Sequence, residues 1–159
     1  MGFDVSQAML DLPQVSGSPL MIRGRFGMVL IPEGVIKFGF ESHLAMGVMS
    51  DNTNATINGA LAEVELEMET ILGIYARAEF FNAGIFGLYG LLGYAAAQTG
   101  PALTALDSDS TTGISYGLGT TFFLNKTLTL QFEVLQVQSA SSDNDFDVAT
   151  INLGINISI

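Results

Sequence analysis

The chain has 159 residues, of which 48% are hydrophobic and only 13% are charged, and its mean hydropathy is +0.43. So few charged residues are too few to cover the outer surface of a soluble barrel. Its net charge of −11 excludes nucleic-acid binding, because five basic residues form no patch that could neutralise phosphates. The absence of cysteine excludes disulfides and thiolate metal sites, and the length suits one domain, expected to cover 1–159.

Apolar and polar side chains alternate along most of the chain, which is the pattern of half-buried strands. No run of about 18 apolar residues is free of polar interruption, so a transmembrane helix is not expected. In chain order the expected strands are 3–10, 21–30, 35–48, 61–80, 86–95, 114–124, 128–134 and 150–159. The sequence therefore predicts an all-β chain of eight strands.

The segment 61–80 shows the alternation over the longest stretch. Glu63, Glu65, Glu67 and Glu69 occupy every second position, which would scatter them around a helix but places them on one face of a strand. The opposite face is expected to carry Val64, Leu66, Met68, Leu72 and Ile74. We therefore expect one long strand with an acidic face and an apolar face.

The expected connections alternate in length. The tight ones are 31–34, 82–84 and 125–127, all rich in turn-forming residues, and the long polar ones are 11–19, 50–60, 98–113 and 139–147. An up-and-down meander gives this pattern, with every tight turn at one end and every long loop at the other. The composition then predicts an antiparallel transmembrane barrel, closed so that every backbone group is paired, with the apolar face outward.

With that orientation, charged side chains lie inside an eight-stranded barrel, whose interior is just wide enough for side chains to fill. The inward charged residues are expected to be Arg23, Arg25, Lys37, Glu41, Arg77, Glu79 and Glu133. Because buried charges are tolerated only in pairs, we expect Arg25, Glu41, Arg77 and Glu133 to form a salt-bridged plug. Their expected neighbours are Arg23, Gln131, Tyr75, Tyr89 and Asn152. Such a plug is either a static polar core or a gate whose ion pairs exchange partners and admit small solutes.

The chain resembles the small eight-stranded outer-membrane barrels of the OmpA/OmpX type over nearly its whole length. The most specific part is NLGINISI, in which Asn152, Gly154, Ile157 and Ile159 match the C-terminal signal that the barrel-assembly machinery reads, although the family usually ends in an aromatic residue. The resemblance implies a monomer in the bacterial outer membrane, in contact with lipid and lipopolysaccharide. It also implies a mature form without signal peptide and without a further periplasmic domain.

Glu63, Glu65, Glu67 and Glu69 lie too far from the tight turn to be within a membrane-spanning stretch of about 9–11 residues. They are expected to line an external mouth or a protruding extension of the strand. This acidic mouth is either a solvated rim or, with the Asp residues of the long loops, a place where divalent cations bridge to lipopolysaccharide.

Catalysis is not expected. Lipid-A-modifying enzymes of this barrel size use a His with a nearby Ser, but the lone His43 falls on the polar face without a neighbouring nucleophile. No catalytic residue, metal or cofactor is therefore assigned. The sequence favours a structural or surface-interaction barrel, and it leaves open a narrow channel, a lipid-modifying enzyme and a soluble lipocalin-type barrel with the polar face outside.

Overall fold

The computed structural model describes residues 1–12, 15–31, 36–57, 60–66, 68–99, 110–137 and 147–158. Within these ranges, side chains are described except at 10–12, 15–16, 53–57, 60–66, 99 and 147. No helix in the described ranges is long and apolar enough to cross a lipid bilayer.

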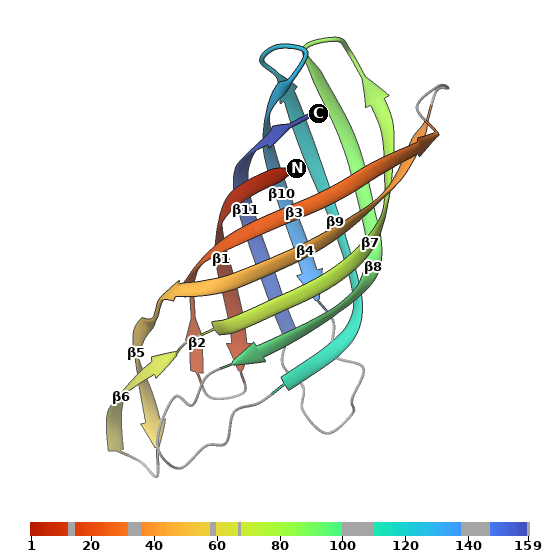
Figure 1. Ribbon diagram of the computed structural model, residues 1–159. Coiled ribbons are helices and arrows are strands. Elements are labelled where there is room, and N and C mark those ends of the chain that lie inside the picture. The colour runs from red at the N-terminus through yellow and green to blue at the C-terminus, as the bar shows by residue number, and fades with distance from the viewer. Residues whose placement is uncertain are drawn as a thin grey trace.

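Eight antiparallel strands form a closed barrel in which each strand pairs with its neighbours in the chain (Figure 1). They are β1 (Gly2–Leu12), β3 (Leu20–Ile31), β4 (Lys37–Met49), β7 (Met68–Asn82), β8 (Phe86–Thr99), β9 (Ser110–Phe123), β10 (Leu128–Val137) and β11 (Asp147–Ile157). The ladder between β1 and β11 closes the sheet and runs from Gly2 opposite Asn156 to Asp11 opposite Asp147. The predicted eight-stranded up-and-down barrel is confirmed.

Three further strands accompany these eight, one in the same sheet and two in a separate sheet. β2 (Val15–Gly17) pairs with the end of β1, and β5 (Asp51–Ile57) pairs with β6 (Ala60–Leu66) in a separate two-stranded sheet at the lower end of Figure 1. The prediction of one strand over 61–80 was therefore wrong, because β6 leaves the barrel and pairs with β5. The predicted long loops 11–19 and 50–60 also contain strand.

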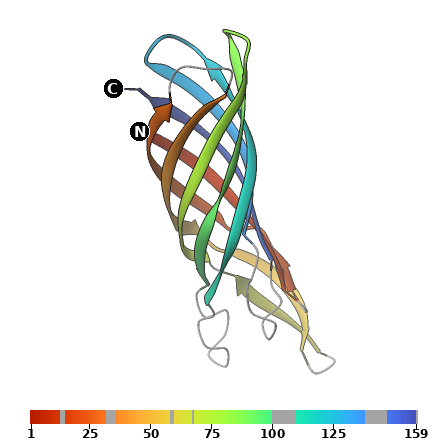
Figure 2. The ribbon, with the colours of Figure 1, turned by 90° about the vertical axis from the view of Figure 1, so that its right-hand side faces the viewer.

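One end of the barrel, which we call the turn end, holds the β7–β8 and β9–β10 turns, the start of β1 and the end of β11 (Figure 2). In the β7–β8 turn, Gly84 has a positive φ of 82° and its amide donates to the side-chain oxygen of Asn82. In the β9–β10 turn, the Asn125 side chain accepts from the amides of Thr127 and Leu128. The predicted turn at 31–34 lies almost wholly outside the described residues.

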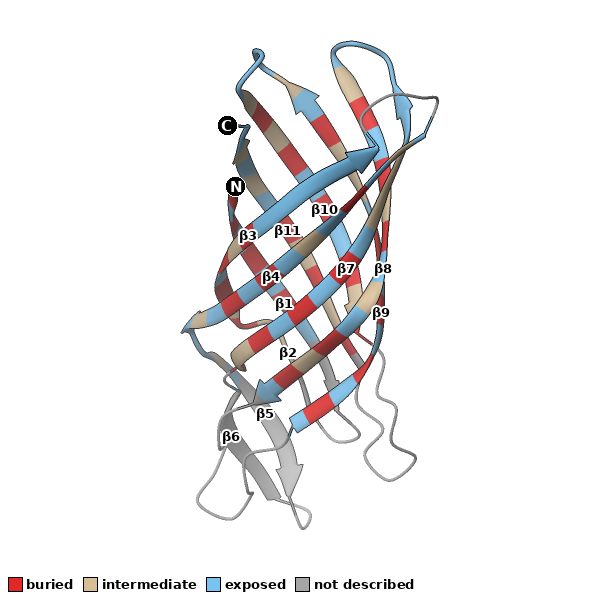
Figure 3. Cartoon of the chain, turned by 45° about the vertical axis from the view of Figure 1, so that its right-hand side comes forward, coloured by how far each residue is buried: buried red, intermediate tan, exposed pale blue. Residues whose placement is uncertain are grey.

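Exposed and buried residues alternate along most of the barrel strands, but residues 26–31 of β3 are all exposed (Figure 3). Ile74 and Leu118 on the outer face are 68% and 66% exposed, whereas inward residues such as Tyr89 and Glu133 are fully buried. The predicted assignment of apolar side chains to the outer face fails at Met68. A register shift between Met68 and Thr70 in the pairing with β8 turns Met68 inward, where it is 0% exposed.

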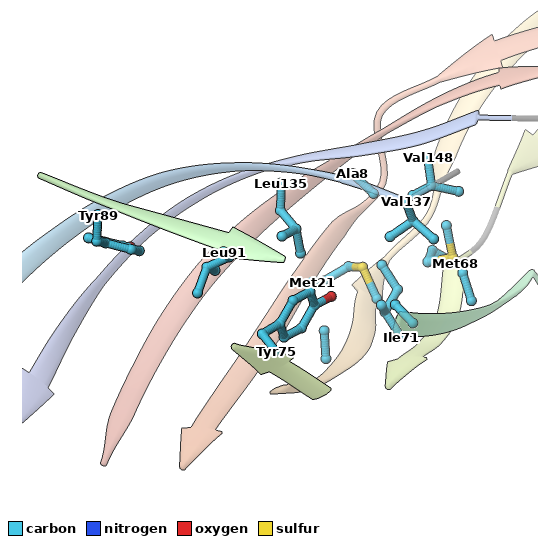
Figure 4. Close-up of a cluster of buried hydrophobic side chains, with 13 residues drawn as sticks. Ala8, Met21, Met68, Ile71, Tyr75, Tyr89, Leu91, Leu135, Val137 and Val148 are labelled. Carbon is cyan, nitrogen blue, oxygen red and sulfur yellow. The ribbon is translucent and has the colours of Figure 1, made fainter. Parts of the chain in front are cut away.

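The interior at the opposite end, which we call the loop end, is apolar and was not predicted. We define the apolar cluster as Ala8, Met21, Met68, Ile71, Leu135, Val137 and Val148, all at most 4% exposed (Figure 4). Val137 pairs with Val148 in the last described rung of the β10–β11 ladder, and Met68 begins β7. The inward face of the wall is therefore mainly apolar at the loop end, with Thr111 and Thr150 among the buried polar residues there.

The packing of Tyr89 against β9 makes a testable prediction. A Cβ atom on Gly119 would overlap the Tyr89 ring, so Gly119→Ala is expected to lower the free energy of unfolding by about 1–3 kcal/mol. Gly24→Ala is the matched control, because the nearest atom to its Cβ would be the Leu44 carbonyl oxygen at 4.0 Å. Urea unfolding of both variants in detergent micelles measures the effect, and equal stabilities would refute this view of the interior.

Candidate functional site

The centre of the interior begins with two arginines that share one carboxylate. Asp4 on β1 accepts from Arg23 Nε at 3.0 Å, and from Arg25 Nε at 2.6 Å and Nη2 at 2.9 Å. Both arginines project inward from β3, two positions apart, and β1 pairs Asp4 directly opposite Arg23. All three side chains are almost fully buried, so the double pairing offsets the cost of removing them from water.

Glu133 on β10 connects this group to the far wall. Its Oε1 accepts from Arg23 Nη1 at 2.5 Å, and its Oε2 accepts from the Tyr89 hydroxyl at 2.8 Å. The side-chain amides of Gln131 and Asn152 also donate to Glu133, and that of Gln131 donates to the Tyr89 hydroxyl. A fully buried carboxylate thus receives one charged donor and three neutral ones.

A second ion pair, between Arg77 and Glu41, is linked through His43 to Arg23. Arg77 Nη1 donates to Glu41 Oε1 at 2.7 Å, and the Arg77 guanidinium lies 3.6 Å from the centre of the Tyr89 ring. The other Glu41 oxygen lies 3.0 Å from His43 Nε2, and His43 Nδ1 lies 3.3 Å from Arg23 Nη1. A neutral His43 with its proton on Nε2 satisfies both contacts, because it donates to Glu41 and accepts from Arg23.

We call this circuit the interior network: Asp4, Arg23, Arg25, Glu41, His43, Arg77, Tyr89 and Glu133. Its three carboxylates match its three guanidinium groups. Neighbouring members come from strands that surround the whole lumen, so the network extends from wall to wall. In this arrangement the charged groups neutralise one another, and none of them is placed as a general base beside a nucleophile.

The four residues expected to form a plug do not pair as one set. The structure brings Arg77 and Glu41 together, but Arg25 pairs with Asp4 and Glu133 pairs with Arg23. Lys37 and Glu79 pair with each other at 3.5 Å nearer the turn end, where Lys37 is 37% exposed. Asp4 was missed, although its alternation with Ser6 and Ala8 opposite an arginine-bearing strand was a usable signal.

A cavity of about 610 Å³ lies between the interior network and the turn end, and we call it the vestibule. Arg25, Glu41 and Arg77 of the network line it, together with Lys37 and Glu79. Thr121, Thr129 and Asn156 add neutral polar groups. The vestibule stops where the network begins, and the apolar cluster lies beyond the network.

The other predicted site residues have separate places. Glu69 is half-buried at the start of β7, the side chains of Glu63 and Glu65 in β6 are not described, and Glu67 lies outside the described residues. Of the proposed assembly signal, Asn152 is buried beside Glu133 and Ile157 is exposed. Gly154 faces Asp4, whose carboxylate a Cβ there would overlap, and Ile159 lies outside the described residues.

No serine hydroxyl among the described residues is hydrogen-bonded to His43. Its sequence neighbour Ser42 points to the outer face, where its hydroxyl donates to the Phe26 carbonyl, while His43 is 2% exposed inside the barrel. Ser115, which is also inside, bonds to Tyr75 and to the Gln136 carbonyl. Neither hydroxyl is bonded to His43, so the described residues contain no His–Ser pair with the geometry of a catalytic base and nucleophile.

Comparisons with known proteins agree with this architecture. A family model described as the outer membrane protein beta-barrel domain matches residues 2–158. Among solved structures, neisserial surface protein A superposes with a TM-score of 0.69 at 9% identity, covering 99% of this chain and 95% of that chain. OprG of Pseudomonas aeruginosa has a TM-score of 0.65 at 12% identity, covering 98% and 94%.

The Ail protein of Yersinia pestis, solved with the heparin analogue sucrose octasulfate, has a TM-score of 0.63 at 15% identity, covering 98% of this chain and 94% of that chain. Identities this low establish a shared fold only. Among curated proteins, no sequence matches this one at a significant level.

The burial of Glu133 makes the second prediction. Glu133→Gln removes the charge that faces Arg23, and the free energy of unfolding is expected to fall by about 3–5 kcal/mol. Glu79→Gln removes a charge from a partly exposed pair and is expected to cost no more than about 1 kcal/mol. Urea unfolding in the same lipid measures both, and a smaller loss for Glu133→Gln than for Glu79→Gln would contradict the network.

Proposed function

The chain belongs to the outer membrane protein beta-barrel domain family and is a bacterial outer-membrane β-barrel, and from this premise we propose that it is a closed, non-enzymatic barrel that acts through its loop end. The membrane band anchors it, and its interior blocks passage. Its acidic loop end meets cationic groups outside the membrane.

Two barriers in series support a closed interior. A solute that entered the vestibule would first meet the interior network, whose charges are bonded to one another, and then the apolar cluster. An ion crossing the cluster would lose its hydration without gaining a partner, which is costly. This succession of a polar and an apolar barrier is the main observation that supports a closed barrel.

Charge is divided unevenly between the two ends. All five basic residues, Arg23, Arg25, Lys37, Arg77 and Lys126, belong to the interior or to a tight turn, where five acidic residues balance them. The remaining 11 acidic residues fall, by sequence, at the loop-end termini of strands or in the segments that join them, and equal the whole net charge of −11. The loop end therefore has no Lys or Arg.

A surface of one sign selects its partners. Sucrose octasulfate is a polyanion, so we do not extend the ligand of the Ail structure to this chain, whose loop end has no cation to bind it. Lipopolysaccharide phosphates would need divalent cations as a bridge, and a basic protein could bind directly. The chain is proposed to be a monomer that the barrel-assembly machinery inserts through Asn152, Gly154 and Ile157.

A narrow channel for small solutes is the second candidate, because the vestibule already opens part of the lumen. The two functions predict different conductance. In planar bilayers the closed barrel is expected to show no discrete openings across a range of voltages. Reproducible unitary openings from the refolded, heat-modifiable protein would favour the channel and refute the closed state.

The loop-end charge predicts binding that depends on divalent cations. Refolded protein is expected to retain lipopolysaccharide with Ca²⁺ and to lose it with chelator. Replacing Glu63, Glu65, Glu67 and Glu69 with Gln should weaken retention severalfold. The control replaces Glu33 and Glu79, which lie in or beside the tight turns predicted from the sequence, and should have no effect. Retention that is insensitive to both chelator and the loop-end variant would contradict the proposed role of the loop end.

A further inference from the structure

Two residues that line the vestibule have hydrogen-bond donors without an acceptor in the described part of the chain. Arg25 is 2% exposed and donates from Nε and Nη2 to Asp4, but its Nη1 has no partner among the described residues. Thr121 on β9, across the barrel from Arg25, is 3% exposed, and its hydroxyl has no hydrogen-bond partner among the described residues. Both residues line the vestibule, and each donor atom is itself covered, so a side-chain rotation brings it to a ligand in the cavity.

Three of the four carboxylate oxygens in the vestibule lining have partners among the described residues. One Glu41 oxygen accepts from Arg77 and the other contacts His43. Glu79 Oε1 accepts from Asn82 at 3.0 Å and is contacted by Lys37 at 3.5 Å. An incoming group can thus gain donors from Arg25 and Thr121, while three of the four carboxylate oxygens in the lining already have partners.

The charges of the lining also favour an anion. Arg25, Lys37 and Arg77 carry three positive charges, against two negative charges on Glu41 and Glu79. Asp4, which is ion-paired with Arg25, does not line the cavity, so the surface that a ligand meets has more cationic than anionic groups. Lys37 is only loosely paired and 37% exposed, so its ammonium group can turn toward a ligand.

From these donors and charges we infer that the vestibule binds a carboxylate or phosphate group that enters from the turn end. Arg25 Nη1 and Thr121 Oγ1 donate to its oxygens, and Lys37 supplies the counter-charge. Such a group is found both on small free anions and on the headgroups of acidic lipids. Apolar side chains at the rim, including Met28, Phe123 and Ile157, suit the second source. The inference is independent of the loop-end proposal, because it uses only the opposite end of the barrel.

The experiment titrates isotope-labelled protein in neutral detergent at constant ionic strength with phosphate, acetate, dodecanoate and dodecyltrimethylammonium. Backbone amide shifts of Gly39, Thr121 and Thr129 report on the vestibule, and that of Gly113 on the loop end. We expect saturable shifts confined to the vestibule with the anions and none with the cationic amphiphile. Saturation by phosphate or acetate identifies a free anion as the source, and saturation by dodecanoate alone identifies a lipid headgroup.

Variants test the residues named. Lys37→Gln with Thr121→Val removes one charge and one donor without touching the interior network, and is expected to weaken binding about tenfold. Lys126→Gln with Thr127→Val is the matched control, because it makes the same changes in a tight turn outside the vestibule lining. Thr121→Val alone, which keeps the side-chain volume, should weaken binding about threefold. The inference is overturned if no anion saturates, if the cationic amphiphile binds equally well, or if both double variants behave alike.

Discussion

The pairing of β1 with β11 is the constraint on which the rest of the structure depends. A sheet in hydrocarbon cannot leave an edge unpaired, because every free backbone group would cost several kcal/mol. The ladder from Gly2 opposite Asn156 to Asp11 opposite Asp147 removes both edges at once. Closure with eight strands then sets the width of the lumen, and the period of two sends every second side chain into it.

The lumen so formed is filled by two different kinds of packing. In the centre, three carboxylates and three guanidinium groups pair with one another and with Tyr89, His43 and neighbouring amides. Toward the loop end, the inward positions become apolar and the wall packs like an ordinary protein core. The small residues that face the network have a matching role, since a side chain at Gly119 would displace Tyr89 and one at Gly154 would displace Asp4.

Alternation in the sequence was sufficient to predict the strands, the closed barrel and the inward direction of the charged residues. It could not predict which charges pair, because pairing depends on the tilt and register of strands distant in sequence. Arg25 therefore pairs with Asp4, which was not among the residues predicted for the plug. Met68 was misplaced because a register shift reverses the alternation locally, and β5 was missed because its Asn- and Thr-rich sequence is typical of a loop. Leu135 and Val137 point inward but are apolar, whereas the inward residues before them in β10 are polar. A change of this kind looks, in the sequence alone, like the end of the strand.

The central claim is that hydrocarbon surrounds the wall and polar groups lie within, and site-directed spin labelling tests it most directly. The chain has no native cysteine, so single labels at Ile74, Leu118 and Leu153 need no background mutations, and Lys126 serves as the exposed control. In lipid vesicles, the account predicts that the first three labels collide with oxygen and are shielded from a water-soluble relaxation agent, whereas Lys126 shows the reverse. Equal access of the water-soluble agent to all four positions would contradict it.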